Sequence, residues 1–168
     1  FAEEGYRALQ TLANAAMRFE TSKIYPGIPE YFNNEGRGMY HYLTGAASWY
    51  ILTFLTEAFG VRGKAGDLEI VPALMREQFD EDGIAEVELP FAGKRFRIMI
   101  KNPKKAAYGK YRVKSAVMDG KELALTESGN EGGTDHPDGK KLVRAVLMKT
   151  EIERLSDEMH TIEILLDL

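Results

Sequence analysis

Residues 84–101 read IAEVELPFAGKRFRIMIK, and this stretch indicates how most of the chain folds. Apolar residues alternate with charged residues on both sides of a short interruption, which is the pattern of two strands that each bury one face. The interruption, Phe91–Lys94, contains Ala92 and Gly93, and small residues of this kind make tight turns between antiparallel strands. The pattern therefore predicts a β-hairpin formed by residues 84–91 and 95–101.

Similar short patterns continue on both sides of this hairpin. Asp119 and Gly120 have the composition of a second hairpin turn, residues 128–141 form a polar, glycine-containing loop, and residues 149–156 predict a short helix or turn. Several short strands separated by turns are typical of an antiparallel β-sandwich or jelly roll, which we assign to residues 60–168. The further predicted strands are 68–71, 111–118, 121–125, 142–148 and 160–168.

The first 59 residues have a helical pattern instead. Apolar residues recur at helical spacing over residues 2–20, and they lie on nearly all sides of a second predicted helix at 44–59. Residues 23–39 between them contain proline, glycine and several aromatic residues, which predicts a loop that lines a site or covers a core. Because a helix that is apolar on most faces is normally buried in a larger helical assembly, two helices are too few to cover it.

The start of the chain supports the same expectation. The chain opens with Phe1 and enters the first predicted helix without a capping residue, so we expect a fragment of a longer protein. The predicted fold class is α+β, with the last two helices and a site loop of a larger helical domain in residues 1–59. The antiparallel β-sandwich of residues 60–168 follows them.

Composition excludes several classes of function. The net charge is −4, which argues against nucleic acid because nucleic-acid binders usually present a basic face. No apolar stretch is long enough to span a bilayer, so we predict no membrane partner. The chain has no cysteine and no pair of histidines with metal-ligand spacing, so we predict no disulfide, no metal and no cofactor. A cytoplasmic location is the default expectation.

The start of the second predicted helix is the first candidate site. Thr44 fits the N-cap position, and Gly45 opens the helix without a side chain. Amides at a helix start, with the helix dipole behind them, form a ready anion-binding site to which a threonine hydroxyl can add a donor. The alternative is an ordinary threonine cap with a glycine for close packing, and the residues alone favour that alternative.

The preceding loop supplies further candidates. The planar guanidinium of Arg37 can form two parallel hydrogen bonds to a phosphate or carboxylate. Glu30 can face sugar hydroxyls, and Tyr40 can stack on a sugar ring. His41 can hydrogen-bond an anion or a hydroxyl. Each also has a structural interpretation, as a solvated loop charge, a core aromatic or a partly buried histidine. Glu30 and Glu35 could be a glycosidase carboxylate pair, but such pairs usually come from separate elements.

Two segments carry a family resemblance. They are GIPEYF at 27–32 and GRGMYHYLTGAASW at 36–49, and the likeness continues through FGVRG at 59–63, GDL at 66–68, QFD at 78–80, FAG at 91–93 and Asn102–Pro103. The sequence resembles glycoside hydrolase family 94, which contains the cellobiose, cellodextrin, chitobiose and 1,2-β-oligoglucan phosphorylases. The likeness covers residues 1–118 well and the remainder weakly.

The resemblance implies a fold and a reaction. Enzymes of this family have a β-sandwich, a linker, an (α/α)6 barrel and a C-terminal jelly roll, so residues 1–59 correspond to the end of the barrel and 60–168 to the jelly roll. They cleave a β-glycosidic bond with inorganic phosphate, as co-substrate, and release an α-sugar 1-phosphate with inversion. The implied partners are a β-linked gluco-oligosaccharide, phosphate and the N-terminal portion of the same enzyme. A homodimer is left open.

The resemblance also assigns roles to residues. The threonine-glycine pair that helps the family to hold phosphate corresponds to Thr44 and Gly45. The catalytic aspartate of the family lies upstream of this chain, so no catalytic residue is expected in residues 1–168 and the fragment is expected to be inactive alone. His41 matches no phosphate-binding histidine of the family, and the roles of Glu30 and Arg37 are hypotheses.

Three other functions remain open at this point. A non-catalytic carbohydrate-binding β-sandwich module would need an exposed row of aromatic residues on one sheet. A split-enzyme or packing subunit would fold only against another chain. A related inverting glycoside hydrolase would need a base carboxylate near the anion site.

Overall fold

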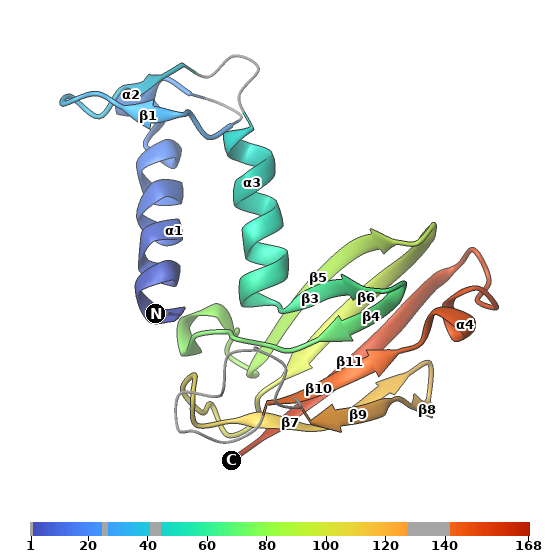
Figure 1. Ribbon diagram of the computed structural model, residues 1–168. Coiled ribbons are helices and arrows are strands. Elements are labelled where there is room, and N and C mark those ends of the chain that lie inside the picture. The colour runs from blue at the N-terminus through green and yellow to red at the C-terminus, as the bar shows by residue number, and fades with distance from the viewer. Residues whose placement is uncertain (1, 25–26, 41–44, 128–141) are drawn as a thin grey trace. The chain divides into compact units, whose positions relative to one another are not determined.

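The computed structural model describes residues 2–24, 27–40, 45–127 and 142–168, and it divides into two compact units, Phe1–Leu55 and Thr56–Leu168. The first unit is mainly helical, and the second is built from two β-sheets (Figure 1). The chain is therefore an α+β protein, as the sequence patterns predict. Among the described helices, none combines the length and the apolar character needed to cross a membrane.

The helical unit begins with α1 (Ala2–Met17), followed at once by the short helix α2 (Phe19–Ser22). The prediction of one helix over residues 2–20 is wrong at its end, because Arg18 leaves the helical backbone conformation with ψ near 70°. The buried hydroxyl of Ser22 donates a hydrogen bond of 2.8 Å to the carbonyl oxygen of Ala16. A side chain thus satisfies one of the carbonyl groups that the end of α1 leaves without a helical partner.

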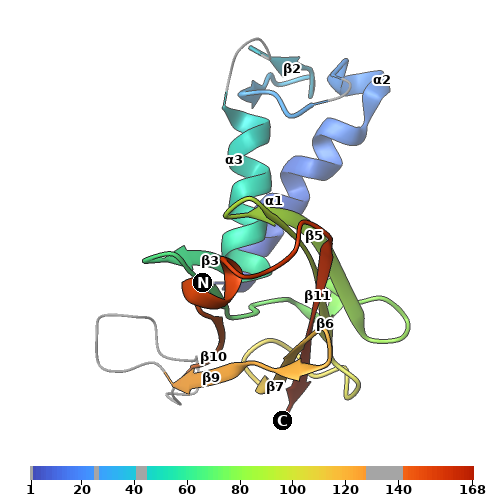
Figure 2. The same ribbon diagram turned by 90° about the vertical axis from the view of Figure 1, so that its right-hand side faces the viewer.

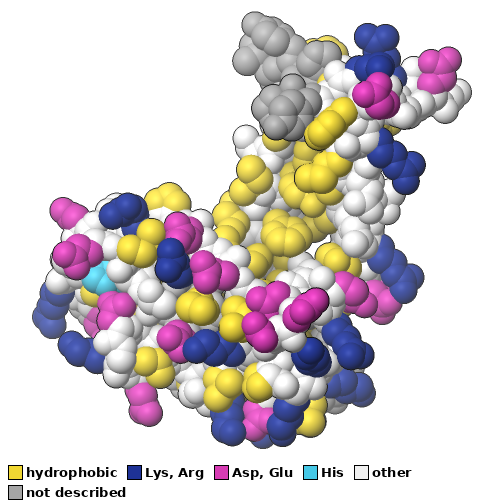
Figure 3. Space-filling view, turned by 180° about the vertical axis from the view of Figure 1, so that it is seen from behind, with side chains coloured by type: hydrophobic (Ala, Val, Ile, Leu, Met, Phe, Trp, Pro, Cys, Tyr) yellow, Lys and Arg dark blue, Asp and Glu magenta, His cyan; other side chains and the backbone are white. Residues whose placement is uncertain are grey.

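The second helix of this unit, α3 (Ala46–Thr53), follows the hairpin β1 (Tyr31–Phe32) and β2 (Gly38–Met39). The helix predicted over 44–59 is confirmed from Ala46 to Ala58, and its last turn, Phe54–Ala58, widens into a π-helix. Trp49, Ile51 and Leu52 are 68%, 59% and 47% exposed within this chain. Figure 3 shows hydrophobic side chains gathered along the helices of this unit. That α3 belongs to a larger helical assembly stays a prediction.

The smaller sheet of the second unit has the strand order β3-β4-β10-β9, and all its pairs are antiparallel. Its strands are β3 (Val61–Lys64), β4 (Asp67–Ile70), β9 (Ala124–Glu127) and β10 (Val143–Leu147). No strand is predicted at β3, because it contains Gly63 and two basic residues in place of an apolar pattern. β3 forms because its backbone pairs with β4 across a two-residue turn.

The larger sheet has the order β5-β6-β11-β7-β8. Its strands are β5 (Ile84–Phe91), β6 (Lys94–Lys101), β7 (Arg112–Met118), β8 (Lys121–Glu122) and β11 (Met159–Asp167), and α4 (Lys149–Ile152) precedes β11. β11 pairs with β6 in parallel and with β7 antiparallel, so a wholly antiparallel sandwich was the wrong expectation. A parallel pair needs a long crossover, and the chain between β6 and β11 is long enough to provide it.

The strand predicted at 121–125 is in fact divided between the two sheets. β8 pairs with β7 in the larger sheet, and β9 pairs with β10 in the smaller one. Leu123, which lies between them, is buried and donates its N–H to the carbonyl oxygen of Ala116. The chain therefore changes sheets at this buried residue, and β7 lies beside both β9 and β10 (Figure 2).

Three hairpin turns each consist of two residues, of which the second is glycine. Ala65–Gly66, Ala92–Gly93 and Asp119–Gly120 connect β3 to β4, β5 to β6 and β7 to β8. Both residues of each turn have positive φ, which is the backbone of a type I′ turn. Glycine tolerates this conformation at the second position, and the right-handed twist of the strands favours the turn.

The core of the sheet unit consists of residues at alternate positions on the central strands. Each of these side chains is at most 1% exposed, and the residues between them face outward. One face of each sheet is thus buried, as the alternating pattern of residues 84–101 predicts. The buried residues are Leu68 and Ile70 on β4, Phe96, Ile98 and Ile100 on β6, Ala145 and Leu147 on β10, and Ile162, Ile164 and Leu166 on β11.

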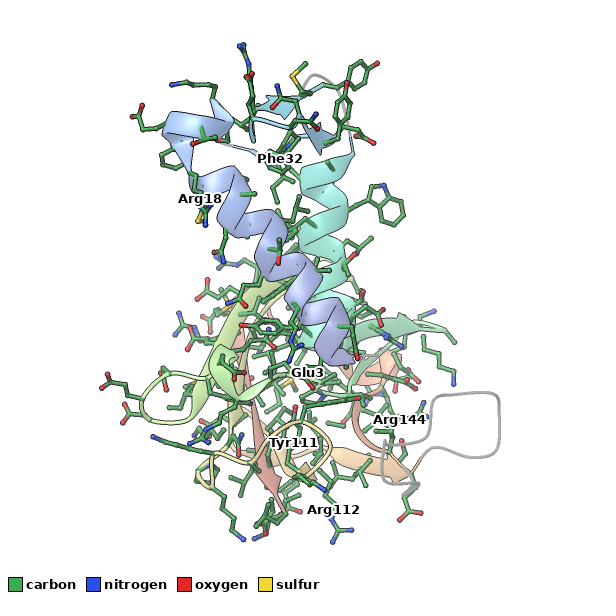
Figure 4. The ribbon with its side chains drawn as sticks, turned by 90° about the vertical axis from the view of Figure 1, so that its left-hand side faces the viewer. Glu3, Arg18, Phe32, Tyr111, Arg112 and Arg144 are labelled. Atoms are coloured by element: carbon green, nitrogen blue, oxygen red, sulfur yellow. The ribbon has the colours of Figure 1, made fainter. Side chains whose placement is uncertain are left out.

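A buried tyrosine attaches the segment after β4 to this core. Tyr111, labelled in Figure 4, is 4% exposed, and its hydroxyl donates a hydrogen bond of 2.8 Å to the carbonyl oxygen of Leu74. Burial raises the pKa of the Tyr111 phenol far above its ordinary value, so the hydroxyl keeps its proton.

We expect Tyr111→Phe to lower the free energy of unfolding of the sheet unit by about 1–3 kcal/mol, because the buried carbonyl of Leu74 loses its donor. Chemical denaturation measures this loss. Tyr31→Phe is the control, because Tyr31 is 55% exposed. An equal loss in both variants would show that the buried hydrogen bond is not the cause.

Candidate functional site

The candidate residues at 30–40 lie on the β1–β2 hairpin of the helical unit. Tyr31 pairs with Met39 and Phe32 with Gly38. The ladder extends by one residue at each end, because the N–H of Glu30 donates to the carbonyl oxygen of Tyr40 at 3.4 Å and the N–H of Asn33 donates to that of Arg37 at 3.0 Å. The predicted irregular loop is therefore a short hairpin with a defined register.

Close packing behind the hairpin explains why it forms. A Cβ at Gly38 would lie 2.4 Å from Cγ1 of Ile24 and 3.0 Å from Pro29, so only glycine fits there. Ile24 is 6% exposed, and its N–H donates to the hydroxyl of Ser22. Figure 4 shows Phe32 pointing from the hairpin toward α1 and α3. The hairpin is thus anchored to the end of the first helical segment.

Asn33 organises the turn that carries Arg37. Its Oδ1 accepts hydrogen bonds from the N–H groups of Glu35 at 3.0 Å and Arg37 at 2.9 Å, and Gly36 takes a positive φ of 79°. These bonds hold the backbone of the turn and leave the guanidinium outside them. In the described part of the chain, the exposed Arg37 side chain forms no ion pair.

The hairpin brings Glu30 and Tyr40 together and keeps Arg37 apart from them. Glu30 lies opposite Tyr40, whereas Arg37 lies three residue pairs further along the ladder, a distance of roughly 10 Å at 3.3 Å per residue. Tyr40 is 70% exposed and has an unusual positive φ of 52°. Glu30 and Tyr40 can therefore share one ligand, and Arg37 can reach it only through its long side chain.

The start of α3 has a glycine where a capping side chain would stand. Gly45 is the N-cap residue and makes no side-chain hydrogen bond, and its carbonyl oxygen accepts the N–H of Trp49 at 2.8 Å. The helix thus begins one residue later than a cap at Thr44 predicts. A Cβ at Gly45 would lie 2.8 Å from Cδ1 of Trp49, so the indole ring lies against the glycine.

Two candidates lie outside the described residues, namely His41 and Thr44. The structure therefore describes Glu30, Arg37, Tyr40 and Gly45 among the predicted site residues. Glu35, the other member of the suggested carboxylate pair, lies in the turn beyond Asn33 and Arg37. Along the hairpin Glu35 lies further from Glu30 than Arg37 does, so the two glutamates belong to opposite ends of the hairpin.

Exposed aromatic residues are found on the helical unit. Within the described ranges, the exposed aromatic side chains are those of Phe19, Tyr31, Tyr40 and Trp49. The exposed row of aromatic residues that a carbohydrate-binding sandwich would need is not seen on the described part of the two sheets. This distribution favours sugar contact at the hairpin over sugar contact at a sheet face.

A polar cluster in the sheet unit was missed from the sequence. Nδ1 of His160 lies 2.7 Å from Oδ2 of Asp119, and Nε2 lies near Ser156. The sequence pattern places Asp119 in a hairpin turn and His160 at the start of a predicted strand, and it gives neither residue a further role. The two are 41 positions apart, so no motif of fixed spacing could have joined them.

No three His, Asp or Glu side chains of the described segments are grouped closely enough to hold a metal ion. The prediction that the protein uses neither metal nor cofactor stays a prediction. The chain matches no protein-family model, and no curated protein matches it.

Proposed function

We propose that the chain is the C-terminal part of an inverting β-glucoside or β-glucan phosphorylase. In this proposal the helical unit contributes to the end of an (α/α)6 barrel, and the sheet unit is a C-terminal jelly roll. The longer protein cleaves a β-glycosidic bond with inorganic phosphate and releases an α-sugar 1-phosphate. The general acid lies outside this chain, and a cytoplasmic location remains part of the proposal.

The observation that carries the proposal is the continuity of one motif along the chain. GIPEYF and GRGMYHYLTGAASW run through the hairpin and into the first turn of α3. That turn begins at Gly45, so no side chain caps the first amides of the helix. The N–H groups of the first helical turn point outward from the N-terminal end of the helix, where the positive end of the helix dipole lies. This arrangement suits an anion such as phosphate.

Each residue has a stated role in this reaction. Thr44 donates its hydroxyl to phosphate, and Gly45 lets the phosphate approach the helix backbone. Glu30 accepts hydrogen bonds from sugar hydroxyls beside the ring of Tyr40, which stacks on the sugar. These residues hold phosphate next to the anomeric carbon, so that the attack follows protonation of the leaving oxygen.

We expect Thr44→Ala, in the longer protein that contains this chain, to raise the KM for phosphate by about tenfold or more. A hydrogen bond to a charged group contributes about 1.5–3 kcal/mol, and each 1.4 kcal/mol corresponds to a factor of ten. The assay supplies β-1,2-, β-1,3- and β-1,4-linked glucosides with inorganic phosphate and measures α-glucose 1-phosphate.

Thr53→Ala is the matched control for this experiment. It makes the same change of residue type at the far end of α3, about 12 Å along the axis from Gly45 at 1.5 Å per residue. Sugar phosphate that forms only with phosphate present, with a weaker phosphate response in Thr44→Ala alone, supports the proposal. Free glucose released without phosphate would identify an inverting hydrolase, and equal effects of the two variants would remove the role of Thr44.

A further inference from the structure

The β1–β2 hairpin has a buried face and an exposed face. In a pair of pleated strands, directly opposite residues share a face, and successive residues alternate between the two faces. Phe32 and Gly38 form one opposite pair. Their face is the buried one, because Gly38 packs against Ile24 and Phe32 points toward α1 and α3 (Figure 4).

The exposed face of the hairpin carries Tyr31 and Arg37. Tyr31 pairs with Met39, and Arg37 lies opposite Asn33 at the turn, so both pairs alternate with the buried pair. Tyr31 is 55% exposed, and Arg37 is also exposed. Arg37 is two residues from the strand partner of Tyr31, and such diagonal neighbours are about 7–8 Å apart, within reach of aromatic and long side chains. One ligand can therefore contact both side chains.

The backbone that carries Arg37 is held in place by the turn itself. Oδ1 of Asn33 accepts the N–H of Arg37 at 2.9 Å, and the N–H of Asn33 donates to the carbonyl oxygen of Arg37 at 3.0 Å. A Cβ at Gly36 would lie 2.9 Å from Cγ2 of Thr21 in α2, so the turn also packs closely against the helical segment. A backbone that is ordered in advance lowers the entropic cost of binding a ligand.

The chemistry of this face suits a neutral ring that carries hydroxyl groups. The phenol ring of Tyr31 offers a flat apolar surface for stacking, and the guanidinium of Arg37 presents several donors in one plane. Glu35, which is exposed in the same turn, adds a carboxylate that accepts hydrogen bonds. A sugar hydroxyl both donates and accepts, so it can use both charged groups, whereas the nearby carboxylate repels an anion.

We propose that Tyr31 and Arg37 form a second sugar contact, which holds a unit of the oligosaccharide further from the reacting bond than the unit that stacks on Tyr40. This inference rests on the proposed function, which supplies a β-linked gluco-oligosaccharide as the ligand. Tyr40 lies at the open end of the hairpin, from which the chain continues to Gly45, and Arg37 lies at the turn end. The second contact therefore contributes mainly to the binding of longer oligosaccharides.

Calorimetric titration of the longer protein, without phosphate, tests this contact. The titrants are disaccharides and tetrasaccharides of glucose with β-1,2, β-1,3 or β-1,4 linkages. We expect Tyr31→Ala and Arg37→Ala each to weaken tetrasaccharide binding about tenfold, and to weaken disaccharide binding by clearly less, because only the longer ligand reaches the turn end. Tyr31→Phe keeps the aromatic ring, so we expect it to retain the tetrasaccharide affinity of the unchanged protein.

Asn34→Ala is the matched control, because Asn34 is an exposed residue of the same turn outside the two pairs. Equal losses for the two ligand lengths, or an equal loss in Asn34→Ala, would overturn the proposal, since a general disturbance of the hairpin does not depend on ligand length. A higher KM for phosphate in Arg37→Ala, with tetrasaccharide binding unchanged, would also overturn it and would make Arg37 an anion contact.

The product of the reaction separates this inference from the proposed function. If the unchanged protein forms sugar phosphate and the variants show no length-dependent loss, only the second sugar contact is overturned. If free glucose is released without phosphate, the phosphorylase is overturned, and a length-dependent loss still establishes the second contact. If none of these oligosaccharides binds, both proposals are overturned.

Discussion

Replacing Phe96 with alanine is expected to lower the free energy of unfolding of the sheet unit by about 3–5 kcal/mol. Phe96 is fully buried on β6, where it pairs with Leu89 of β5 and His160 of β11. Removing the ring takes away apolar packing contacts in the core and leaves a cavity. The three paired strands keep this cavity from closing. A loss of this size is a large part of the stability of a domain of ordinary size.

Arg95→Ala is the control for the Phe96 prediction. Arg95 is the preceding residue of the same strand and is exposed, so the backbone pairing is the same while the side chain lies outside the core. We expect a change within about 0.5 kcal/mol for Arg95→Ala. The measurement is denaturant unfolding followed by circular dichroism. If Phe96→Ala lowers the free energy of unfolding by less than about 1 kcal/mol, the Phe96 side chain does not stabilise the core as its burial indicates.

Replacing Gly60 with alanine is expected to lower the free energy of unfolding by about 3 kcal/mol or more. Gly60 has φ of 69°, and a Cβ built there would lie 1.7 Å from the carbonyl oxygen of Val71. The left-handed conformation alone costs a non-glycine residue about 1–2 kcal/mol, and the overlap is with backbone, which cannot rotate away. The carbonyl oxygen of Gly60 also accepts the N–H of Val71 at 2.9 Å, so relieving the overlap would disturb this hydrogen bond.

Gly93→Ala separates the two contributions. Gly93 has φ of 77°, similar to that of Gly60, but a Cβ there meets nothing within 4 Å. We expect a cost of about 1 kcal/mol for Gly93→Ala, from backbone conformation alone. Unfolding of both variants in denaturant gives the comparison. Equal costs at the two positions would contradict the close approach of Gly60 to Val71.

The residues that build the strands could be found in the sequence because strand burial has a local cause. Side chains alternate between faces every second residue, so Phe96, Ile98 and Ile100 are recognisable as core without knowledge of their partners. The β5 prediction at 84–91 agrees with the strand bounds, and the turn at Ala92–Gly93 is where the sequence predicts it. Pairing β6 with β11 is different, because strand order depends on the whole chain.

The candidate site could likewise be predicted from the sequence only in part. The residue types of Glu30, Arg37 and Tyr40 suggested polar contacts and stacking, and their order in the chain was visible. Their mutual positions were not, because the register of the hairpin depends on Ile24 and Pro29 packing against Gly38. This packing places Glu30 opposite Tyr40 and leaves Arg37 at the other end of the ladder.

The sequence by itself determined most elements of this protein: an α+β composition, two helical segments, alternating strands, and hairpin turns at Ala92–Gly93 and Asp119–Gly120. Each follows from interactions between residues close together in the chain, which depend on local residue types. The tertiary structure alone decided the parallel pairing of β6 with β11, the division of residues 121–127 between two sheets, and the contact of His160 with Asp119. Those features join distant segments, and which distant segments meet is settled by packing the complete core.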